Sequence, residues 1–156
     1  MAFQVRGLDP KPFQKYYGKS EEELKSLGII RYQVDEYPGY PDRVTLSEVE
    51  AGGTVLLMNY EHLPVASPYR SRHAIFVQEG AREADLVIDK VPDSLATRIL
   101  SLRAFDENDH IVEADLAEGE AIEPTILRML GNTDVQYIHA HYAQRGCYAA
   151  LIERNA

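Results

Sequence analysis

The sequence contains one cysteine and no tryptophan among its 156 residues. A single cysteine excludes an internal disulfide and every C-x-x-C motif. The motifs of several large enzyme classes are absent as well: the chain has no P-loop, no G-x-G-x-x-G, no H-E-x-x-H and no G-x-S-x-G. These absences remove reaction classes from consideration without assigning one.

The chain also lacks long apolar runs and an excess of positive charge. No apolar run approaches the ~20 residues that span a bilayer, and the opening MAFQVRGLDPKPF lacks the charged-then-apolar pattern of a signal peptide. The formal net charge is −9, which disfavours contact with phosphate backbones. We therefore expect a cytoplasmic protein that binds neither membranes nor nucleic acid.

The composition is that of a soluble globular protein, with 45% hydrophobic and 26% charged residues. The length suits one domain with a core of its own. No repeat, low-complexity segment or linker divides the chain. We therefore predict a single domain over residues 1–156.

Local patterns predict two short helices and several strands. Ser20 and Glu23 form a capping box that begins one helix, and Gly28 fits the position just after its end. Residues 123–132 predict a second helix, with Pro124 in its first turn and Gly131 just after its end. Residues 54–60 and 73–78 are nearly continuous apolar runs, typical of strands buried on both faces at the centre of a sheet. Weaker strand patterns cover residues 3–8 and 29–36.

Residues 98–119 predict a hairpin with the three-residue loop Glu107-Asn108-Asp109. In that register three apolar residues on each strand share one face: Leu100, Leu102 and Ala104 with Val112, Ala114 and Leu116. Arg103 and Glu113 lie opposite each other on the second face. With a further hairpin at the C-terminus, these elements predict an α+β fold of mostly antiparallel strands.

The C-terminal hairpin, YIHAHYAQRGCYAALIER over residues 137–154, holds two of the five histidines and the only cysteine. His139 and His141 point to one side because strand side chains alternate. A two- or four-residue loop turns Cys147 away from them, whereas the three-residue loop Gln144-Arg145-Gly146 turns it toward them. Glycine in the third position favours the three-residue loop, so we expect Cys147 on the histidine face.

Three interpretations of that face stay open. His139 and His141 are candidate metal ligands, but H-x-H is incomplete, and only the fold can bring Cys147, His62 or His73 to it; we assign no metal ligands. A histidine can instead activate the Cys147 thiol as a nucleophile. The third interpretation is structural, since cysteine is often buried as a small hydrophobe.

A second segment, residues 60–77, frames a polar loop between the two apolar strands. Loops held by rigid strands often carry binding residues, and arginine can grip a carboxylate or phosphate through two hydrogen bonds. A solvated loop whose arginines balance an acidic surface is the alternative. The candidate ligand-binding residues here are His62, Tyr69, Arg70 and His73.

Both segments resemble the bacterial family called domain of unknown function 1203. The resemblance is carried by residues 41–46, 55–77 and 137–154 and by the hairpin between them, and it covers nearly the whole chain. Its most specific part is the Y-I-H-x-H…R-G-C ending. The resemblance implies an intact domain of bacterial origin and no particular activity or cofactor.

The sequence therefore predicts a small polar or anionic ligand between the loop at residues 60–73 and the C-terminal hairpin, with Arg70 neutralising its charge. One alternative is an enzyme with Cys147 as nucleophile and His139 or His141 as base. Another is a homo-oligomeric or partner-binding module without catalysis. The sequence does not decide whether the protein is an enzyme.

Overall fold

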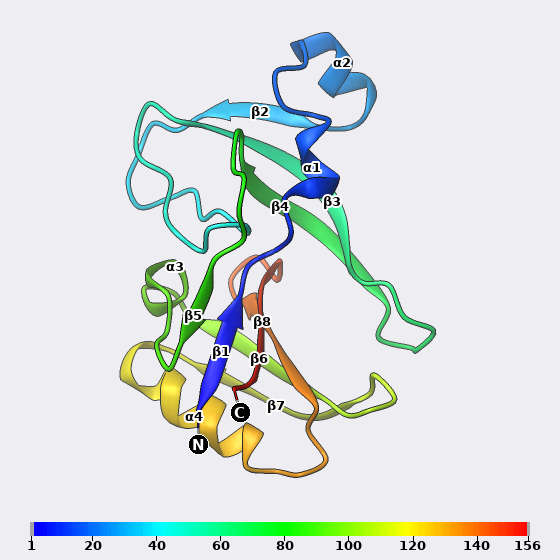
Figure 1. Ribbon diagram of the computed structural model, residues 1–156, viewed down its shortest axis with the longest axis vertical. Coiled ribbons are helices and arrows are strands. Elements are labelled where there is room, and N and C mark those ends of the chain that lie inside the picture. The colour runs from blue at the N-terminus through cyan, green and yellow to red at the C-terminus, as the bar shows by residue number, and fades with distance from the viewer. Residues whose placement is uncertain (1, 156) are drawn as a thin grey trace.

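The computed structural model describes residues 2–155 and contains two antiparallel sheets (Figure 1). The larger sheet has the strand order β5-β1-β9-β8-β6-β7, and the smaller has the order β2-β3-β4. All strand pairings in the described chain are antiparallel, which confirms the predicted α+β class with its C-terminal hairpin. The strands are β1 Phe3–Arg6, β2 Ile30–Gln33, β3 Thr54–Leu63, β4 Ser71–Gln78, β5 Leu86–Ile88, β6 Leu100–Phe105, β7 Ile111–Ala117, β8 Tyr137–Tyr142 and β9 Tyr148–Arg154.

Both predicted helices are present, as α2 (Glu21–Ser26) and α4 (Ile122–Leu130). Ser20 accepts a hydrogen bond from the Glu23 amide and completes the predicted capping box. The prediction of two helices was incomplete, because α1 (Lys11–Gln14), α3 (Asp93–Ala96) and the 3-10 turn Gly119–Ala121 are also present. Each of these is about one turn long, too short for the helical periodicity that a sequence pattern needs.

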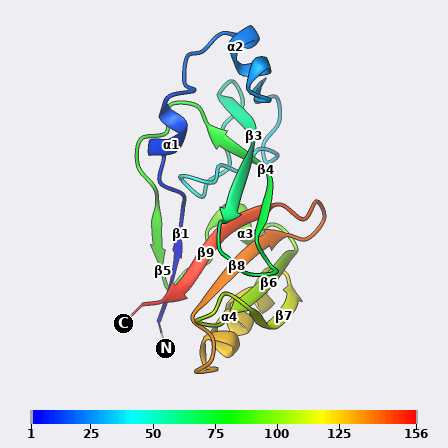
Figure 2. The ribbon, with the colours of Figure 1, turned by 90° about the vertical axis from the view of Figure 1, so that its right-hand side faces the viewer.

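Each sheet packs its own core. One face of the larger sheet is covered by α3 and α4, which bury Leu95 and Ile126 against it. The smaller sheet packs against α1 and α2 through Phe13 and Leu24. The second face of the larger sheet is therefore free of helices, and the β3-β4 hairpin lies across it (Figure 2).

The prediction that residues 54–60 and 73–78 are central strands buried on both faces was half wrong. β3 is the central strand of the smaller sheet, but β4 is an edge strand with alternating burial. Ile75 and Val77 enter the core, while Phe76 lies on the opposite face under Tyr32 and Tyr40. Aromatic cover on that face explains why the sequence shows little polar alternation.

The β6-β7 hairpin has the predicted loop but not the predicted register. The Asp106 amide donates to the His110 carbonyl oxygen at 2.9 Å, as a three-residue loop requires. Val112 is then an extra residue that shifts the remaining pairing by one. Arg103 consequently faces Ala114 instead of Glu113. The prediction that Val112 and Leu116 share a face with Leu100, Leu102 and Ala104 is wrong as well: those three are buried, whereas Val112 and Leu116 are 43% and 65% exposed. One bulge residue moves every later side chain of its strand to the other face.

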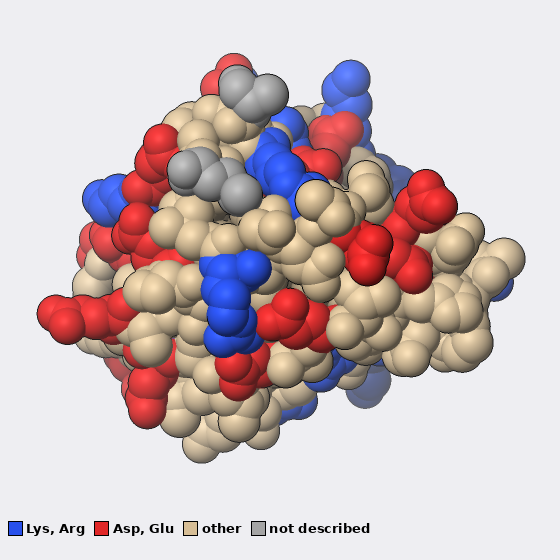
Figure 3. Space-filling model, turned by 90° about the horizontal axis from the view of Figure 1, so that it is seen from below, with Lys and Arg blue, Asp and Glu red and all other residues tan. Residues whose placement is uncertain are grey.

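Acidic and basic side chains are interspersed on the face shown in Figure 3, where a short central strip of basic groups is bordered by carboxylates. Within residues 2–155, no helix is long and apolar enough to cross a membrane.

Candidate metal centre

The β8-β9 hairpin combines the two registers that its sequence allows. Ile138, His139 and Ala140 pair with Ile152, Leu151 and Ala150, as the three-residue loop predicts. Beyond this point Ala149 is an extra residue, and His141 pairs with Tyr148. The Tyr142 amide then donates to the Cys147 carbonyl oxygen, which encloses a four-residue loop.

This bulge exchanges Cys147 and Tyr148 between the two faces. Cys147 packs against the core cluster that contains Tyr142, so the prediction that it shares the histidine face is wrong. Tyr148, which the three-residue loop would place on the face opposite the histidines, lies among them, with its ring stacked on His62 at a centroid distance of 5.0 Å. Gly146 does adopt the predicted positive φ, 84°, but glycine also permits the longer loop that forms here.

The β3-β4 hairpin lies beside β8 (Figure 2) and brings His62 and His73 into contact with His141. His73 pairs with Tyr60 on the neighbouring strand, and an irregularity between Tyr60 and Leu63 lets the ring of His62 stack on that of His73 at 5.3 Å. The His141 ring lies 5.0 Å from that of His62 and 5.7 Å from that of His73. Four of the five histidines thus form one group, the histidine cluster: His62, His73, His139 and His141.

Three members of the cluster lie close enough together to be candidate metal ligands. One ring nitrogen each of His62, His73 and His141 lies within 4.8 Å of the other two. Imidazoles bound tetrahedrally to zinc, with bonds of about 2.0–2.1 Å, hold their nitrogens about 3.4 Å apart. A three-histidine coordination set would need these separations to shorten by up to about 1.4 Å and the stacked rings of His62 and His73 to rotate so that their in-plane lone pairs meet.

The cluster is buried, yet several of its nitrogens have no partner. His139 and His141 are 5% and 1% exposed, while His62 and His73 are only partly buried. The Nδ1 atoms of His62, His73 and His139 are buried without a hydrogen bond in the described chain. Native proteins rarely leave buried polar atoms unpaired, and each such atom costs about 1–3 kcal/mol.

His141 is the oriented member of the cluster. Its Nδ1 lies 2.9 Å from the carbonyl oxygen of Gly146. A carbonyl only accepts, so Nδ1 carries the proton and Nε2 presents a lone pair. Metal-binding histidines commonly use such a second hydrogen bond to fix ring orientation and tautomer.

The environment keeps the cluster uncharged near neutral pH. Burial, assisted by the positive charge of neighbouring side chains, lowers the pKa of His62 to about 4 and the pKa of His139 and His141 to about 3. Burial likewise lowers the pKa of His73. Neutral imidazole is the form that binds metal ions.

Arg103 is a cationic group beside the cluster and was not among the predicted site residues. It lies on β6 as the cross-strand partner of His139, and its charge contributes to the lowered pKa of all four histidines in the cluster. Its pairing with Glu113 was predicted from the wrong register. The charged residue in the strand sequence LSLRAF was the signal in the sequence.

The structure does not bring the loop residues Arg70 and Tyr69 into the cluster. Arg70 has a 62% exposed side chain and forms an ion pair with Glu61 at 2.9 Å. Tyr69 packs edge-on against Phe105 and His110. The loop is thus fastened to the β6-β7 hairpin, where the Ser67 hydroxyl also donates to the Asp109 carbonyl oxygen.

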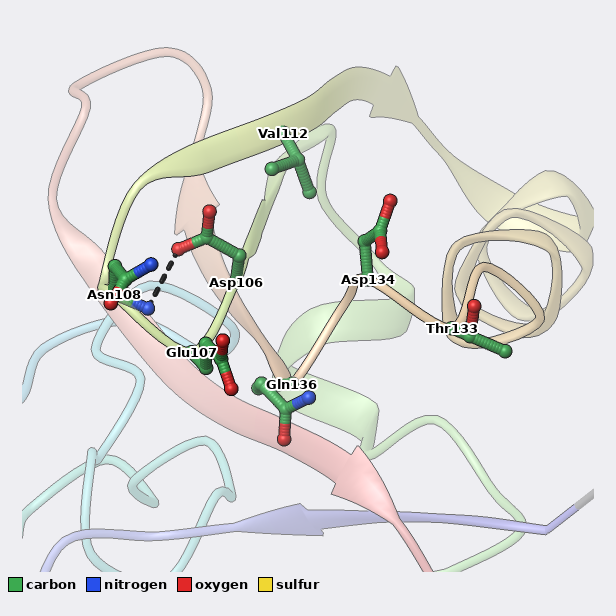
Figure 4. Close-up of a pocket in the computed structure, with 7 residues that line it drawn as sticks. All are labelled: Asp106, Glu107, Asn108, Val112, Thr133, Asp134 and Gln136. Carbon is green, nitrogen blue, oxygen red and sulfur yellow. Dashed lines mark hydrogen bonds between the residues drawn. The ribbon is translucent and has the colours of Figure 1, made fainter.

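A surface cleft lies beside the β6-β7 loop (Figure 4). One carboxylate there is already engaged, because Asp106 Oδ1 accepts from the backbone amides of Asn108 and His110 at 2.9 and 3.0 Å. These bonds shape the turn, so they explain the position of Asp106 without a ligand. The cleft is lined by Asp106, Glu107, Asn108, Val112, Thr133, Asp134 and Gln136.

Comparison with known protein families gives a match to this chain. The model of the family described as "Protein of unknown function (DUF1203)" matches residues 39–154, which include every residue of the histidine cluster. No curated protein and no solved structure matches the chain.

Proposed function

Since the chain belongs to the DUF1203 family, whose description assigns no activity, we propose from the geometry alone that it binds a divalent transition-metal ion through His62, His73 and His141. Imidazole nitrogen suits zinc, copper, nickel and iron. Three histidines leave a coordination position for water or for an exogenous ligand, the arrangement of a catalytic or ligand-binding metal.

The observation that carries this proposal is the convergence of three imidazole nitrogens within 4.8 Å. Two of these imidazoles also have a buried nitrogen without a partner, and the third has its tautomer fixed by Gly146. A metal ion bound through the Nδ1 atoms of His62 and His73 would give them the partner that the protein does not supply. Because the lowered pKa values keep the rings neutral, little proton release opposes binding at pH 7.

The alternative with Cys147 as a nucleophile loses its geometric basis. The bulge at Ala149 turns the thiol toward the core cluster, where Arg43 Nη2 donates a hydrogen bond to its sulfur at 3.1 Å. Neither His139 nor His141 lies on that face, so neither is placed to take its proton. The metal proposal keeps both histidines in the site and excludes the cysteine.

Metal titration tests the proposal directly. Protein freed of metal with a chelator is dialysed against Zn²⁺ or Co²⁺, bound metal is measured by elemental analysis, and affinity is measured by calorimetry. We expect one ion per chain, and loss of at least about 100-fold in affinity for His141→Ala, because the oriented ligand is removed. Far-UV circular dichroism confirms folding of each variant.

Two matched controls make the outcome specific. His110→Ala removes the one histidine outside the cluster, and Cys147→Ala removes the thiol on the other face; both should bind metal like the wild type. Absence of stoichiometric binding to the wild type, or an equal loss in His110→Ala, would overturn the proposal.

Other predictions from the sequence accompany this proposal without a structural test. They are a single domain, a cytoplasmic location, a small anionic ligand and possible homo-oligomers. The anionic ligand has a specific place in the metal site, which is argued next.

A further inference from the structure

Arg103 points into the histidine cluster without an anionic partner. Its strand pairs with β8 so that Arg103 lies opposite His139 and Ser101 lies opposite His141, and directly opposed side chains share a face. Its only hydrogen bond within residues 2–155 runs from Nε to the Ser101 hydroxyl at 3.2 Å. Both terminal guanidinium nitrogens therefore remain available.

The charges of the site are not balanced by the protein. Arg103 forms no ion pair with a carboxylate in the described chain. Glu61, the acidic neighbour of His62, is engaged by Arg70. Neutral imidazoles contribute no negative charge, so a bound dication and the Arg103 guanidinium would lie together in a partly buried place. Such uncompensated charge is unfavourable without a counterion.

We propose that the metal site takes a small carboxylate-bearing molecule, one carboxylate oxygen binding the metal at its open position and the other accepting hydrogen bonds from Arg103. This inference rests on the proposed metal site and names its ligand class. The guanidinium fork matches a carboxylate geometrically, and charge-assisted hydrogen bonds of this kind are strong.

His139 completes the binding site for this anion. Its buried Nδ1 has no partner, its Cα pairs with that of Arg103, and it lies outside the three-nitrogen set. Tyr148 packs edge-on against its ring at 5.0 Å and restricts its orientation. An imidazole N–H at this position is placed to donate to the bound carboxylate.

A cobalt titration with acetate tests the inference. The Co²⁺-loaded protein is titrated with sodium acetate, against sodium perchlorate at equal ionic strength, while the visible absorption of cobalt is recorded. We expect a saturable spectral change with acetate only. Arg103→Gln should weaken acetate binding at least about 10-fold, whereas Arg128→Gln, on α4 beneath the other face, should bind acetate like the wild type.

Arg103→Gln should also change the affinity for Co²⁺ itself, and in the opposite direction to the acetate affinity. Without acetate, Arg103→Gln should bind Co²⁺ more tightly than the wild type, because a repelling charge is gone. A structural role for Arg103 would instead loosen metal binding in both conditions. Arg103→Lys keeps the positive charge, so without acetate it should bind Co²⁺ like the wild type. It should have only part of the wild-type acetate affinity, since lysine lacks the planar guanidinium fork.

The outcomes separate the two proposals. If Co²⁺ does not bind to the wild type, the metal site fails and the inference fails with it. If Co²⁺ binds but acetate leaves its spectrum unchanged, or if Arg103→Gln binds acetate like the wild type, only the inference is overturned.

Discussion

The two sides of the β8-β9 hairpin carry two buried polar clusters that differ in how completely their atoms are paired. On the core side, Arg43 is 2% exposed and donates to the carbonyl oxygens of Pro41 and Tyr148 at 2.8 Å, as well as to Cys147. On the other side, the histidine cluster leaves three nitrogens without partners. We call the first group the arginine cluster: Arg43, Glu48, Arg98, Tyr142 and Cys147.

The charged groups of the arginine cluster have partners within the protein. Arg98 pairs with Glu48 and donates to the Ser94 carbonyl oxygen, and both guanidinium groups lie over the Tyr142 ring at 4.8 and 5.1 Å. Such saturation indicates a structural role, fastening the loop at residues 36–49 to the start of β9. Unpaired nitrogens that converge indicate a role that an external group completes. Three substitutions and one change of pH test this distinction.

The largest effect is expected for Arg43→Leu in the arginine cluster. The substitution leaves two carbonyl oxygens without their donor and removes the cation–π contact with Tyr142. We expect the free energy of unfolding to fall by about 4 kcal/mol, measured by urea denaturation. Metal affinity of the fraction that folds should stay near that of the wild type. A loss of less than 1 kcal/mol would contradict the structural role.

An intermediate effect is expected from pH, through the histidine cluster. His139 and His141 have a pKa of about 3 when folded and about 6.5 when unfolded. Between these values the unfolded chain binds more protons, so stability of the metal-free protein falls as pH falls from 6.5 toward 3. Each of the two residues should lower the free energy of unfolding of the metal-free protein by about 2 kcal/mol between pH 7 and pH 5.

His139→Leu is the matched variant for this pH effect. The metal-free variant should be at least as stable as the wild type at pH 7, because an unpaired buried nitrogen is replaced by apolar atoms. It should also lose about 2 kcal/mol less between pH 7 and pH 5. Urea midpoints at both pH values provide the measurement. A variant that is less stable at pH 7 and keeps the full pH dependence would show that His139 is already satisfied in the fold.

The smallest effect is expected for Arg70→Gln. Its ion pair with Glu61 is largely exposed to solvent, and such pairs contribute about 0–1 kcal/mol. Metal and acetate affinities should both match those of the wild type within a factor of about two. A clear loss of acetate affinity would restore Arg70, the arginine indicated by the sequence, in place of Arg103.

Much of the fold was predictable because it depends on local patterns. The capping box at Ser20 and Glu23 fixes α2, and the two hairpins follow from turn residues between apolar strands. Both hairpins nevertheless deviate by one residue, at Val112 and Ala149. Alternation alone does not reveal a bulge, since the residues after it still alternate, only on the other face.

The candidate site, like the fold, was predicted only in part. The sequence identified His139 and His141 as one face and named His62 and His73 as partners that the fold must supply, and the structure brings the four together. It misled on Cys147 and Tyr148, which the bulge exchanges between the faces. Arg103 was missed because its neighbour His139 depends on a contact between distant segments, β6 with β8.

X-ray absorption spectroscopy of the zinc-loaded protein tests the central claim most directly, because it counts the imidazoles around the metal. With His62, His73 and His141 as ligands, the spectrum should require three imidazoles at about 2.0–2.1 Å and at least one further oxygen ligand, and His73→Ala should lower the imidazole count to two. A spectrum fitted by oxygen ligands alone, or one unchanged by His73→Ala, would contradict the account.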